Sequence, residues 1–375
     1  MRILHLHSSF SAGGKELRAA RLMNAFGPEV AHAVVSAQPD AYGAAVALDP
    51  EIEVEYPRDF PSLQGRPTPL RLLRLARAMQ GFDLVLTYNW GAMDAVLAHR
   101  LYAGVLGLGP LVHHEDGFNE DEAQGLKPAR NQFRRVALAR ASALVVPSRR
   151  LQAIALDAWR QPAARVRLIV NGIDTGAYRE PPSADAVPGL IKTPGERWLG
   201  TLAGLRAVKN LPRLVRAFAA LPEDWRLVIV GEGPERDAIA AQAAACGVAE
   251  RVHLPGFVPD PSRVVGLFDI FALSSDSEQF PISVVEAMAA GVAVASPAVG
   301  DVADMVSGDN RRFVTAAGDE AALAGSLRLL AADEALRSAV GEANRARAQA
   351  DYDEKSMIRD YRETYGRALG RTAFP

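Results

Sequence analysis

Residues 274–291 read Ser-Ser-Asp-Ser-Glu-Gln-Phe-Pro-Ile-Ser-Val-Val-Glu-Ala-Met-Ala-Ala-Gly. The apolar run Ile270–Ser274 has the length and composition of a buried strand, and a helical pattern begins near Pro281–Ile282. A strand, a short polar loop and a helix in this order form the repeating unit of an α/β protein with a parallel sheet. The segment therefore places Glu278 in the loop and Glu286 about one turn into the helix.

Two series of such units run along the chain. The strand-like runs of the first series are Arg2–His7, Ala33–Ser36, Leu84–Tyr88, Leu111–His114, Ala143–Pro147 and Val166–Val170. Those of the second series are Trp198–Ala203, Arg226–Val230, Val252–Leu254, Ile270–Ser274, Val292–Ser296 and Arg312–Val314. Helical patterns such as Leu211–Ala220 and Pro234–Cys246 lie between the strands. The alternation predicts two doubly wound, Rossmann-like α/β domains.

A polar, proline-containing stretch without a periodic pattern separates the two series. A connection of that length is unusual inside a compact domain, so it indicates a domain boundary. We therefore expect an N-terminal domain over residues 1–174, a linker over 175–196 and a C-terminal domain over 197–352. The last helical stretch, about 353–375, would cross back to the N-terminal domain. Because doubly wound sheets bind ligands at the carboxyl ends of their strands, two facing domains would form one cleft.

The composition excludes several classes of function. The 42 Lys and Arg residues against 44 Asp and Glu residues give a formal charge of −2, which argues against a nucleic-acid-binding protein. The single cysteine, Cys246, excludes an internal disulfide bond and a cysteine-based metal cluster. No apolar run is long enough to span a bilayer, and the chain begins with a strand-like run, Ile3–His7, so we expect a cytoplasmic protein.

The charge is uneven along the chain. Residues 1–172 hold 20 basic and 16 acidic side chains, whereas the remainder holds 22 and 28. Two helical patterns carry part of the N-terminal excess, the first as Arg71, Arg74 and Arg77 and the second as Arg134 and Arg135. These arginines form either a solvated helix face or a patch that contacts an anionic acceptor or the headgroups at the inner face of a membrane.

Two glycine-containing turns follow predicted strands. Gly13 and Gly14 precede a helix whose free N–H groups and positive dipole end suit a phosphate group. Gly231 and Gly233 follow a strand, but Arg236 stands where the dinucleotide fingerprint needs a third small residue. Nicotinamide binding is therefore disfavoured, and a nucleotide-adjacent loop or a plain turn is expected there.

Glu278 and Glu286 are eight residues apart across the strand–helix junction, so both can face the strand-end crevice. A carboxylate accepts two hydrogen bonds at once and suits a pair of sugar hydroxyls. The helix N-terminus between the two glutamates can hold an anion. The alternative interpretation is structural, with Glu286 on the surface of the helix and Glu278 as an acidic residue at the helix start.

This strand–loop–helix segment resembles the retaining glycosyltransferases of family 4, whose fold is the two-domain GT-B architecture. Glu278 and Glu286, with the trailing Ala-Met-Ala-Ala-Gly, match the family's two glutamates separated by seven residues. The Gly13-Gly14 turn, the junction 170–174 and the Gly231-Glu232-Gly233-Pro234 turn extend the resemblance over nearly the whole chain.

The resemblance implies a role for each residue of this segment. Glu286 would bind the ribose of a nucleotide, and Glu278 would lie beside the donor sugar. The residues that would line the sugar and the phosphates between them are Phe280, Pro281, Ile282 and Ser283. The family more usually has Gly-Phe-Gly at the positions of Gln279, Phe280 and Pro281. Because proline lacks an N–H, one backbone donor to the ligand would be missing.

The family also grips the diphosphate with an arginine and a lysine after the first strand of the second domain. Lys209 matches the lysine, whereas Gly204 occupies the usual arginine position and Arg206 follows two residues later. Either Arg206 binds the diphosphate in place of the usual arginine from a different backbone position, or Lys209 provides most of the contact with the diphosphate.

A histidine near the donor sugar commonly ends a strand of the N-terminal domain in this family. The corresponding run here is Leu-Val-His-His-Glu-Asp, residues 111–116. One alignment places Asp116 at the histidine position, and another uses His113 or His114. The alternative for each histidine is a place in the core or in a loop.

The resemblance implies a hexosyltransferase that moves a sugar, with retention, from a nucleoside-diphosphate sugar to a glycan or lipid-linked acceptor in polysaccharide or glycolipid synthesis. Lys209, Arg206 and a helix N-terminus would stabilise the leaving diphosphate, so neither a metal nor another cofactor is expected. Two alternatives stay open, a nucleotide-sugar epimerase of the same fold and a non-catalytic protein that binds nucleotide sugars or glycans.

Overall fold

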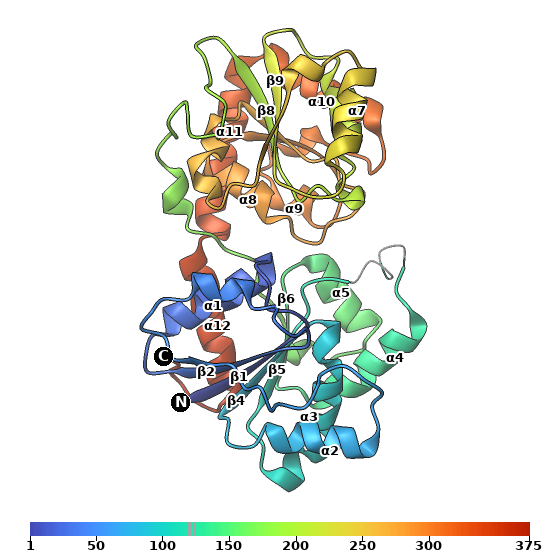
Figure 1. The fold of residues 1–375 in the computed structure, drawn as a ribbon, viewed down its shortest axis with the longest axis vertical. Coiled ribbons are helices and arrows are strands. Elements are labelled where there is room, and N and C mark those ends of the chain that lie inside the picture. Colours follow the sequence, from blue (N-terminus) through green and yellow to red (C-terminus); the bar gives the residue numbers. More distant parts are fainter. Residues whose placement is uncertain (119–121, 123–124) are drawn as a thin grey trace. The chain divides into compact units, whose positions relative to one another are not determined.

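The computed structural model describes residues 1–118, 122 and 125–375. It divides into two compact units, one formed by Met1–Val170 with Met357–Pro375 and the other by Asn171–Ser356. Each unit is built around one wholly parallel sheet with helices on both faces (Figure 1). The predicted α/β class with two doubly wound units is confirmed.

The first unit contains a seven-stranded sheet in the order β3-β2-β1-β4-β5-β6-β7. Its strands are β1 (Arg2–His7), β2 (Ala31–Ser36), β3 (Val54–Glu55), β4 (Leu84–Tyr88), β5 (Leu111–His114), β6 (Ala143–Val146) and β7 (Val166–Leu168). Its helices are α1 (Gly14–Phe26), α2 (Pro69–Ala78), α3 (Met93–Leu106), α4 (Pro128–Ala137) and α5 (Arg149–Asp157), and most of α12 (Glu354–Ala368) packs on it.

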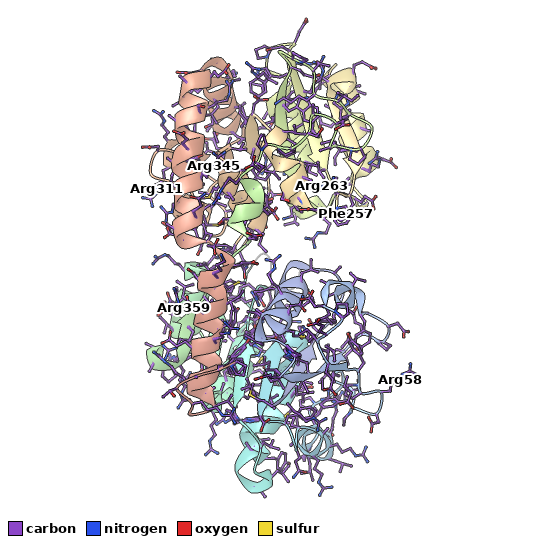
Figure 2. All side chains as sticks on the ribbon, turned by 90° about the vertical axis from the view of Figure 1, so that its left-hand side faces the viewer. Arg58, Phe257, Arg263, Arg311, Arg345 and Arg359 are labelled. Carbon is purple, nitrogen blue, oxygen red and sulfur yellow. The ribbon has the colours of Figure 1, made fainter. Side chains whose placement is uncertain are left out.

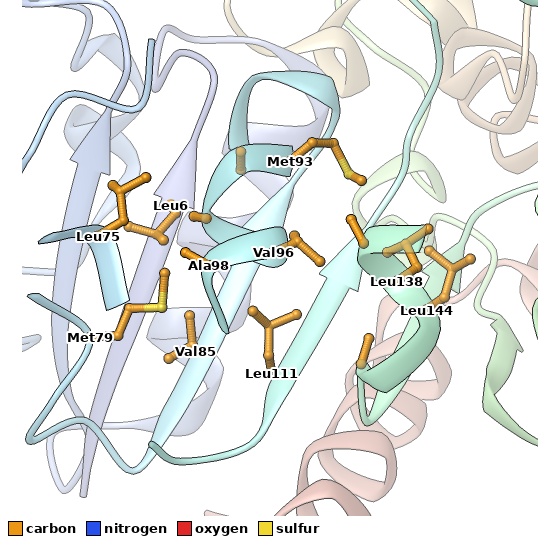
Figure 3. Close-up of a cluster of buried hydrophobic side chains, with 14 of the residues drawn as sticks. Leu6, Leu75, Met79, Val85, Met93, Val96, Ala98, Leu111, Leu138 and Leu144 are labelled. Carbon is orange, nitrogen blue, oxygen red and sulfur yellow. The ribbon is translucent and has the colours of Figure 1, made fainter. Parts of the chain in front are cut away.

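Alternation along the strands gives this sheet two hydrophobic faces. On one face, Leu4 and Leu6 of β1 belong to a single hydrophobic core that also contains apolar side chains of α2, α3, α4 and α5. Figure 3 shows part of this core. The opposite face packs Ile3 of β1 against α1 and against Met357, Tyr361 and Tyr365 of α12. Successive residues of a strand point to opposite faces, so a single strand supplies both cores.

The second unit contains a six-stranded sheet in the order β10-β9-β8-β11-β12-β13. Its strands are β8 (Arg197–Leu202), β9 (Trp225–Val230), β10 (Val252–Gly256), β11 (Ile270–Ala272), β12 (Ala293–Pro297) and β13 (Val314–Thr315). Its helices are α6 (Leu211–Phe218), α7 (Arg236–Ala245), α8 (Ile282–Ala289), α9 (Val302–Met305), α10 (Glu320–Ala332) and α11 (Glu334–Asp351).

Both sheets reverse their winding direction beside their first strand. In the first unit β1 pairs with β2 on one side and with β4 on the other. In the second unit β8 pairs with β9 and with β11. At such a topological switch point the loops from the two neighbouring strands diverge and leave a crevice for a ligand.

Every predicted strand is present, and its ends differ from the prediction by at most two residues. The short edge strand β3 was not predicted, because two residues carry no periodic signal. Near residue 312 the expected strand begins later, since Arg311–Phe313 forms a single 3₁₀ turn before β13.

The polar stretch 175–196 lies within the second unit. Val187 is fully buried, and the Lys192 ammonium lies 2.7 Å from both the Leu267 carbonyl and the Asp269 carboxylate. Helix α12 starts in the second unit, and from Met357 onward it belongs to the first.

Two helical glycines of the second unit differ in their surroundings. A Cβ on Gly341 of α11 would lie 2.0 Å from the carbonyl oxygen of Gly291, whereas a Cβ on Gly325 of α10 meets nothing within 4 Å. We expect Gly341→Ala to lower the free energy of unfolding by about 1–3 kcal/mol, because a backbone atom must shift. Gly325→Ala should raise it by about 0.5–1 kcal/mol through helix propensity. Urea unfolding of the two variants measures both, and equal shifts would contradict the packing described.

Candidate active site

The candidate site of the second unit lies at its switch point, where β8 and β11 are neighbours. Lys209 ends the 3₁₀ turn Ala207–Lys209 after β8, and Glu278 lies in the loop after β11. The Lys209 Nζ is 2.5 Å from Glu278 Oε1, and the Ser275 hydroxyl donates a hydrogen bond to the same oxygen at 2.7 Å. The side chains of Lys209 and Glu278 are 16% and 12% exposed, so the ion pair is largely shielded but can still be reached by a ligand.

Hydrogen bonds join the two loops that carry this pair. The Ser274 hydroxyl donates to the Lys209 carbonyl at 2.9 Å, and the Asp276 N–H donates to the Val208 carbonyl at 2.9 Å. The Asp276 carboxylate pairs with Arg213 at 2.7 Å. The backbone positions of Lys209 and Glu278 are therefore fixed relative to each other within the second unit.

Helix α8 begins next to Glu278. Pro281 is its N-cap residue, and among the described residues no side chain caps this end. The N–H groups of Ile282 and Ser283 lie in the first turn, where backbone donors and the helix dipole favour an anion. Phe280 is buried and packs edge-on against Tyr352, with 5.7 Å between ring centroids.

Glu286 lies one turn into α8 and is half-buried. Arg206 is exposed and lies three residues before Lys209. The structure thus brings Lys209, Glu278 and the start of α8 together, and it leaves Arg206 at the surface. The ribose role of Glu286 and the phosphate role of Arg206 stay predictions.

Gly231 and Gly233 pack the loop after β9 against the loop after β8. Their φ angles are 144° and 154°, and a Cβ on Gly231 would lie 1.9 Å from the Ala203 carbonyl oxygen. The Leu205 N–H donates to the Glu232 carbonyl at 2.8 Å across this contact. This packing holds the segment that leads to Lys209, and a direct role of the two glycines in ligand binding stays a prediction.

In the first unit the loop after β1 leads into α1. Gly13 is the N-cap residue of α1 and Gly14 is its first residue. The Lys15 ammonium and the Glu16 carboxylate form an ion pair in the first turn. Donor binding by Gly13 and Gly14 stays a prediction.

Asp116 lies after β5, at the same end of the first sheet. Both of its carboxylate oxygens accept hydrogen bonds from Arg18 of α1, at 2.6 and 3.0 Å. The Asp116 N–H donates to the Asn89 side-chain oxygen at 2.8 Å. Burial would raise the pKa of Asp116, but the charge and hydrogen bonds of Arg18 outweigh burial and hold the pKa below its ordinary value.

His113 and His114 both have buried rings on opposite faces of the sheet. His113 Nδ1 lies 2.8 Å from the Thr87 hydroxyl, on the face covered by α4. His114 Nε2 lies 2.8 Å from the Tyr365 hydroxyl of α12, on the other face. The Asp116 side chain is 11% exposed, whereas His113 and His114 are at most 1% exposed.

Buried aromatic and imidazole rings continue from His114 across the α12 face. His7 stacks on Tyr88 with 3.9 Å between centroids, and His5 lies 3.1 Å from the Tyr88 hydroxyl and 3.0 Å from His32. Burial lowers the pKa of each histidine, to about 3 for His114 and to about 4 for His32. These rings are therefore neutral at pH 7.

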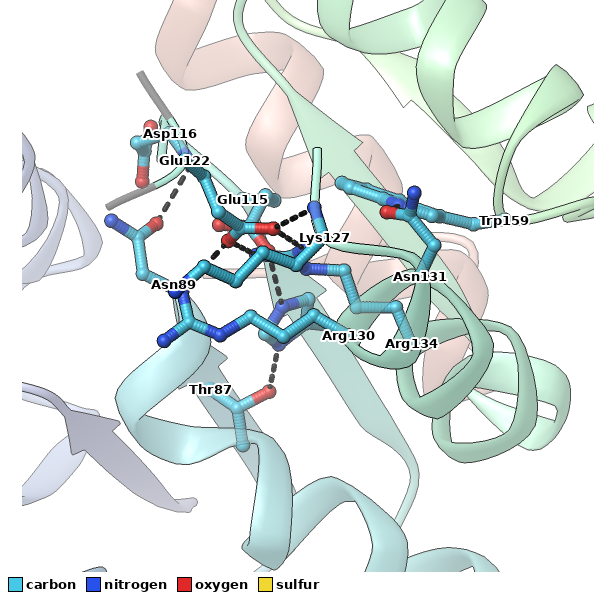
Figure 4. Close-up of polar contacts among 11 residues, drawn as sticks. Thr87, Asn89, Glu115, Asp116, Glu122, Lys127, Arg130, Asn131, Arg134 and Trp159 are labelled. Atoms are coloured by element: carbon cyan, nitrogen blue, oxygen red, sulfur yellow. Dashed lines mark hydrogen bonds and ion pairs between the residues drawn. The ribbon is translucent and has the colours of Figure 1, made fainter. Parts of the chain in front are cut away.

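Arg134 of α4 is fully buried among charges and rings (Figure 4). It donates to the two carboxylate oxygens of Glu122 at 3.1 and 3.0 Å, and its Nε lies 3.3 Å from Glu115. The aromatic rings of Trp90, Phe118 and Trp159 surround its guanidinium group at 4.9–5.3 Å.

The prediction that Arg134 contributes to a basic surface is therefore wrong. Two carboxylates and three aromatic rings replace its hydration, which allows an arginine to be buried. Arg71 is also committed to a partner, because it lies 2.5 Å from Asp94 and is only 17% exposed. Arg74 and Arg77 are exposed on α2, and Arg135 is half-buried on α4.

Sequence reasoning missed the residues that support the candidates. Arg18 lies one helical turn after Gly14, but no pattern distinguishes it from a surface arginine. Asn89 takes a left-handed φ of 55° directly after β4, and only its place at a strand end could have marked it. Ser275 lies in the segment 274–291, but no pattern there predicts its hydrogen bond to Glu278.

Two family models match the chain. The model described as Glycosyltransferase Family 4 matches residues 12–177, and the model described as Glycosyl transferases group 1 matches residues 190–347. The two regions together cover most of the chain and divide it near the boundary between the units. The chain belongs to the family 4 glycosyltransferases. The predicted resemblance and the GT-B fold are confirmed.

Curated relatives of this family member are distant. It is 24% identical over 207 residues to N-acetyl-alpha-D-glucosaminyl L-malate synthase of Bacillus anthracis, covering 55% of this chain and 54% of the relative. It is 28% identical over 183 residues to the lipopolysaccharide core mannosyltransferase LpcC of Rhizobium leguminosarum, covering 47% and 52%. The matched part of the chain thus spans about half the length of these relatives.

HepE of Anabaena, solved in complex with UDP, has a similar structure. The TM-score is 0.82 at 22% identity, and the match covers 98% of this chain and 100% of HepE. At that identity the likeness concerns the fold. HepE has also been solved with UDP-glucose, with a TM-score of 0.78.

The residues that the structure describes hold neither a membrane-spanning helix nor a cluster of metal ligands. None of their helices combines the length and the apolar character needed to cross a bilayer. The same residues contain no group of three or more His, Cys, Asp or Glu side chains that could hold a metal ion.

The buried histidines of the first unit, His5, His7, His32 and His114, predict that acid lowers the stability of this unit. Burial holds the pKa of these histidines below 6.5 in the folded state, so below pH 6.5 each takes up a proton when the protein unfolds. Its contribution to the free energy of unfolding is therefore present above pH 6.5 and is lost as the pH falls toward the folded-state pKa. We expect the free energy of unfolding to fall by about 1.4 kcal/mol per pH unit for each such histidine. Native-state hydrogen exchange of β1 and β4 at pH 7 and pH 5 measures the loss.

The variant His7→Phe isolates one of these groups, because both ring nitrogens of His7 lack a hydrogen-bond partner among the described residues. Below pH 6.5 the free energy of unfolding of the variant should fall less steeply with pH than that of the wild type, because one fewer proton is taken up on unfolding. A change in stability with the same slope would show that His7 contributes packing alone.

Proposed function

We propose that this chain transfers a sugar, with retention of anomeric configuration, from a nucleoside-diphosphate sugar to an acceptor hydroxyl. The observation that carries the proposal is the ion pair of Lys209 and Glu278 at the β8–β11 switch point, next to the start of α8. A cation beside free helix N–H groups suits a diphosphate, and the neighbouring carboxylate suits sugar hydroxyls.

The charge that develops during the reaction explains this arrangement. Cleavage of the anomeric C–O bond leaves negative charge on the diphosphate and positive charge on the sugar ring. The Lys209 ammonium has three N–H donors, so it can hold the Glu278 carboxylate and a phosphate oxygen together. Its partner Glu278 fixes it before the donor arrives, which avoids reorganisation when the bond breaks.

We propose that the acceptor oxygen attacks the anomeric carbon on the face from which the diphosphate leaves. The new C–O bond then forms as the old one breaks, and the acceptor proton passes to a leaving phosphate oxygen. Lys209, Arg206 and the first-turn N–H groups of α8 would compensate the charge, so the reaction would proceed without a metal ion. Activity in the presence of a chelator tests that point.

The relatives support a nucleotide-sugar donor. The UDP and UDP-glucose complexes of HepE suggest UDP-sugars as the first donors to test. LpcC acts in lipopolysaccharide core biosynthesis, which suggests a glycan or lipid-linked acceptor here. A lipid-linked acceptor would require this chain to contact a membrane.

We assign the second unit to the donor and the first unit to the acceptor. At the end of β5 we assign the role beside the sugar to Asp116, because the rings of His113 and His114 are buried. The bidentate contact with Arg18 keeps Asp116 ionised, so it can accept a hydrogen bond from a hydroxyl but cannot act as a general acid at pH 7.

Lys209→Ala tests the central assignment. We expect kcat/KM to fall by about 10²-fold, because one group that stabilises phosphate charge is worth roughly 3 kcal/mol in the transition state. The matched control is Lys355→Ala, which removes an exposed lysine near the start of α12. Wild-type kinetics in a folded Lys209→Ala protein would remove Lys209 from the mechanism.

Incubation with donor alone separates transfer from the alternatives. A transferase hydrolyses the donor slowly at most and needs an acceptor for turnover, whereas an epimerase converts the sugar of the donor. Binding of donor without turnover against any glycan acceptor would favour a non-catalytic protein.

A further inference from the structure

Three adjacent helices of the first unit expose aliphatic side chains. Leu70 of α2 is 60% exposed, Leu101 and Val105 of α3 are 52% and 85% exposed, and Val136 of α4 is 40% exposed. The opposite sides of these helices fill the core that covers one face of the sheet (Figures 1 and 3). Single exposed leucines are common, but a group on neighbouring helices indicates an interaction surface.

Hydrogen bonds show that these side chains belong to neighbouring segments. Leu101 and Val105 are four residues apart on α3 and share one side of that helix. The Tyr102 hydroxyl donates to the carbonyl of Pro69, the residue before Leu70, at 3.5 Å. The Arg100 guanidinium donates to the carbonyl of Val136 on α4.

The same helices carry unbalanced positive charge. Arg74 and Arg77 lie four and seven residues after Leu70, so the three side chains share one side of α2. The single acidic residue of α2, α3 and α4 is Asp94, which pairs with Arg71. Neither Arg74 nor Arg77 forms an ion pair with a carboxylate in the described part of the chain.

We propose that this surface, the α2–α4 face (Leu70, Arg74, Arg77, Leu101, Val105 and Val136), docks on an anionic phospholipid bilayer. Exposed aliphatic groups beside unpaired arginines match the acyl boundary and the phosphate layer of such a membrane. A nucleic acid would use the arginines but not the aliphatic groups. The inference deepens the proposed function and rests on it only for the lipid-linked acceptor that the docked protein would reach.

Vesicle flotation of the 375-residue chain tests the docking. The probes are vesicles of phosphatidylcholine with phosphatidylglycerol and vesicles of phosphatidylcholine alone. The wild type should float with the anionic vesicles, bind the neutral ones weakly, and dissociate as salt rises, because screening weakens exposed charges.

Two variants separate the charged and the apolar contributions. Arg74→Gln with Arg77→Gln should weaken binding about 30-fold, at roughly fivefold per arginine near an anionic surface. Val105→Asp should weaken it by about tenfold or more through loss of apolar insertion. Both changes are at exposed positions, so the fold of the unit should persist.

Matched controls carry the same changes on the second unit. Arg263→Gln with Arg328→Gln removes two exposed arginines, one of them labelled in Figure 2, and Leu329→Asp changes a leucine that is 63% exposed. Both control variants should bind anionic vesicles like the wild type. Equal weakening in test and control variants would mean that net charge, and not this face, governs binding.

The remaining outcomes contradict the proposal. A wild-type protein that does not float with anionic vesicles removes it. Val105→Asp that abolishes a dimer without changing flotation assigns the face to a second copy of the chain. Tighter binding to a soluble polyanion than to vesicles assigns it to an anionic polymer. Turnover of a water-soluble acceptor by every variant, measured in parallel, separates failure of docking from failure of the proposed function.

Discussion

The ion pair between Lys209 and Glu278 depends on strand order. Lys209 and Glu278 are 69 residues apart in the sequence, yet they meet because β8 and β11 are neighbours in a parallel sheet. The loops of two such strands leave the sheet at the same edge, and hydrogen bonds from Ser274 and Asp276 then fix their backbones. A lysine held in this way presents its charge at the start of α8 before any ligand binds, which is the preorganisation that charge stabilisation requires.

The first unit also has a parallel sheet with a switch point beside its first strand, but an arginine–aspartate ion pair lies at its strand ends. Arg18 lies in the helix after β1, and Asp116 follows β5. Their bidentate ion pair lies beside buried histidine and tyrosine rings. Those rings lie under α12, so the final helix is held by polar as well as apolar contacts. Arg134 with Glu115 and Glu122 forms a second buried network on the opposite face of the sheet. The first unit thus buries two polar networks beside its two apolar cores, and its exposed α2–α4 face is partly apolar.

Periodicity predicted the fold well, because strands buried on both faces and helices between them leave strong signals. The pairing of Lys209 with Glu278 could be anticipated only through the family resemblance, since strand order cannot be read from spacing. Arg134 was misplaced, because helical spacing on α4 cannot show that Glu115 and Glu122, which precede the helix, fold back onto it. His113 and His114 looked equivalent in sequence, yet alternation in β5 sends them to opposite faces. Long-range pairing of charges is what the sequence leaves undetermined.

The proposed mechanism requires one position for the donor diphosphate, and a crystal structure of this chain with UDP tests that position most directly. We predict a phosphate oxygen within hydrogen-bonding distance of the Lys209 ammonium and of the first-turn N–H groups of α8, with the ribose toward Glu286. A diphosphate bound elsewhere, for example against the Gly231–Gly233 turn with Lys209 still paired to Glu278 alone, would contradict it.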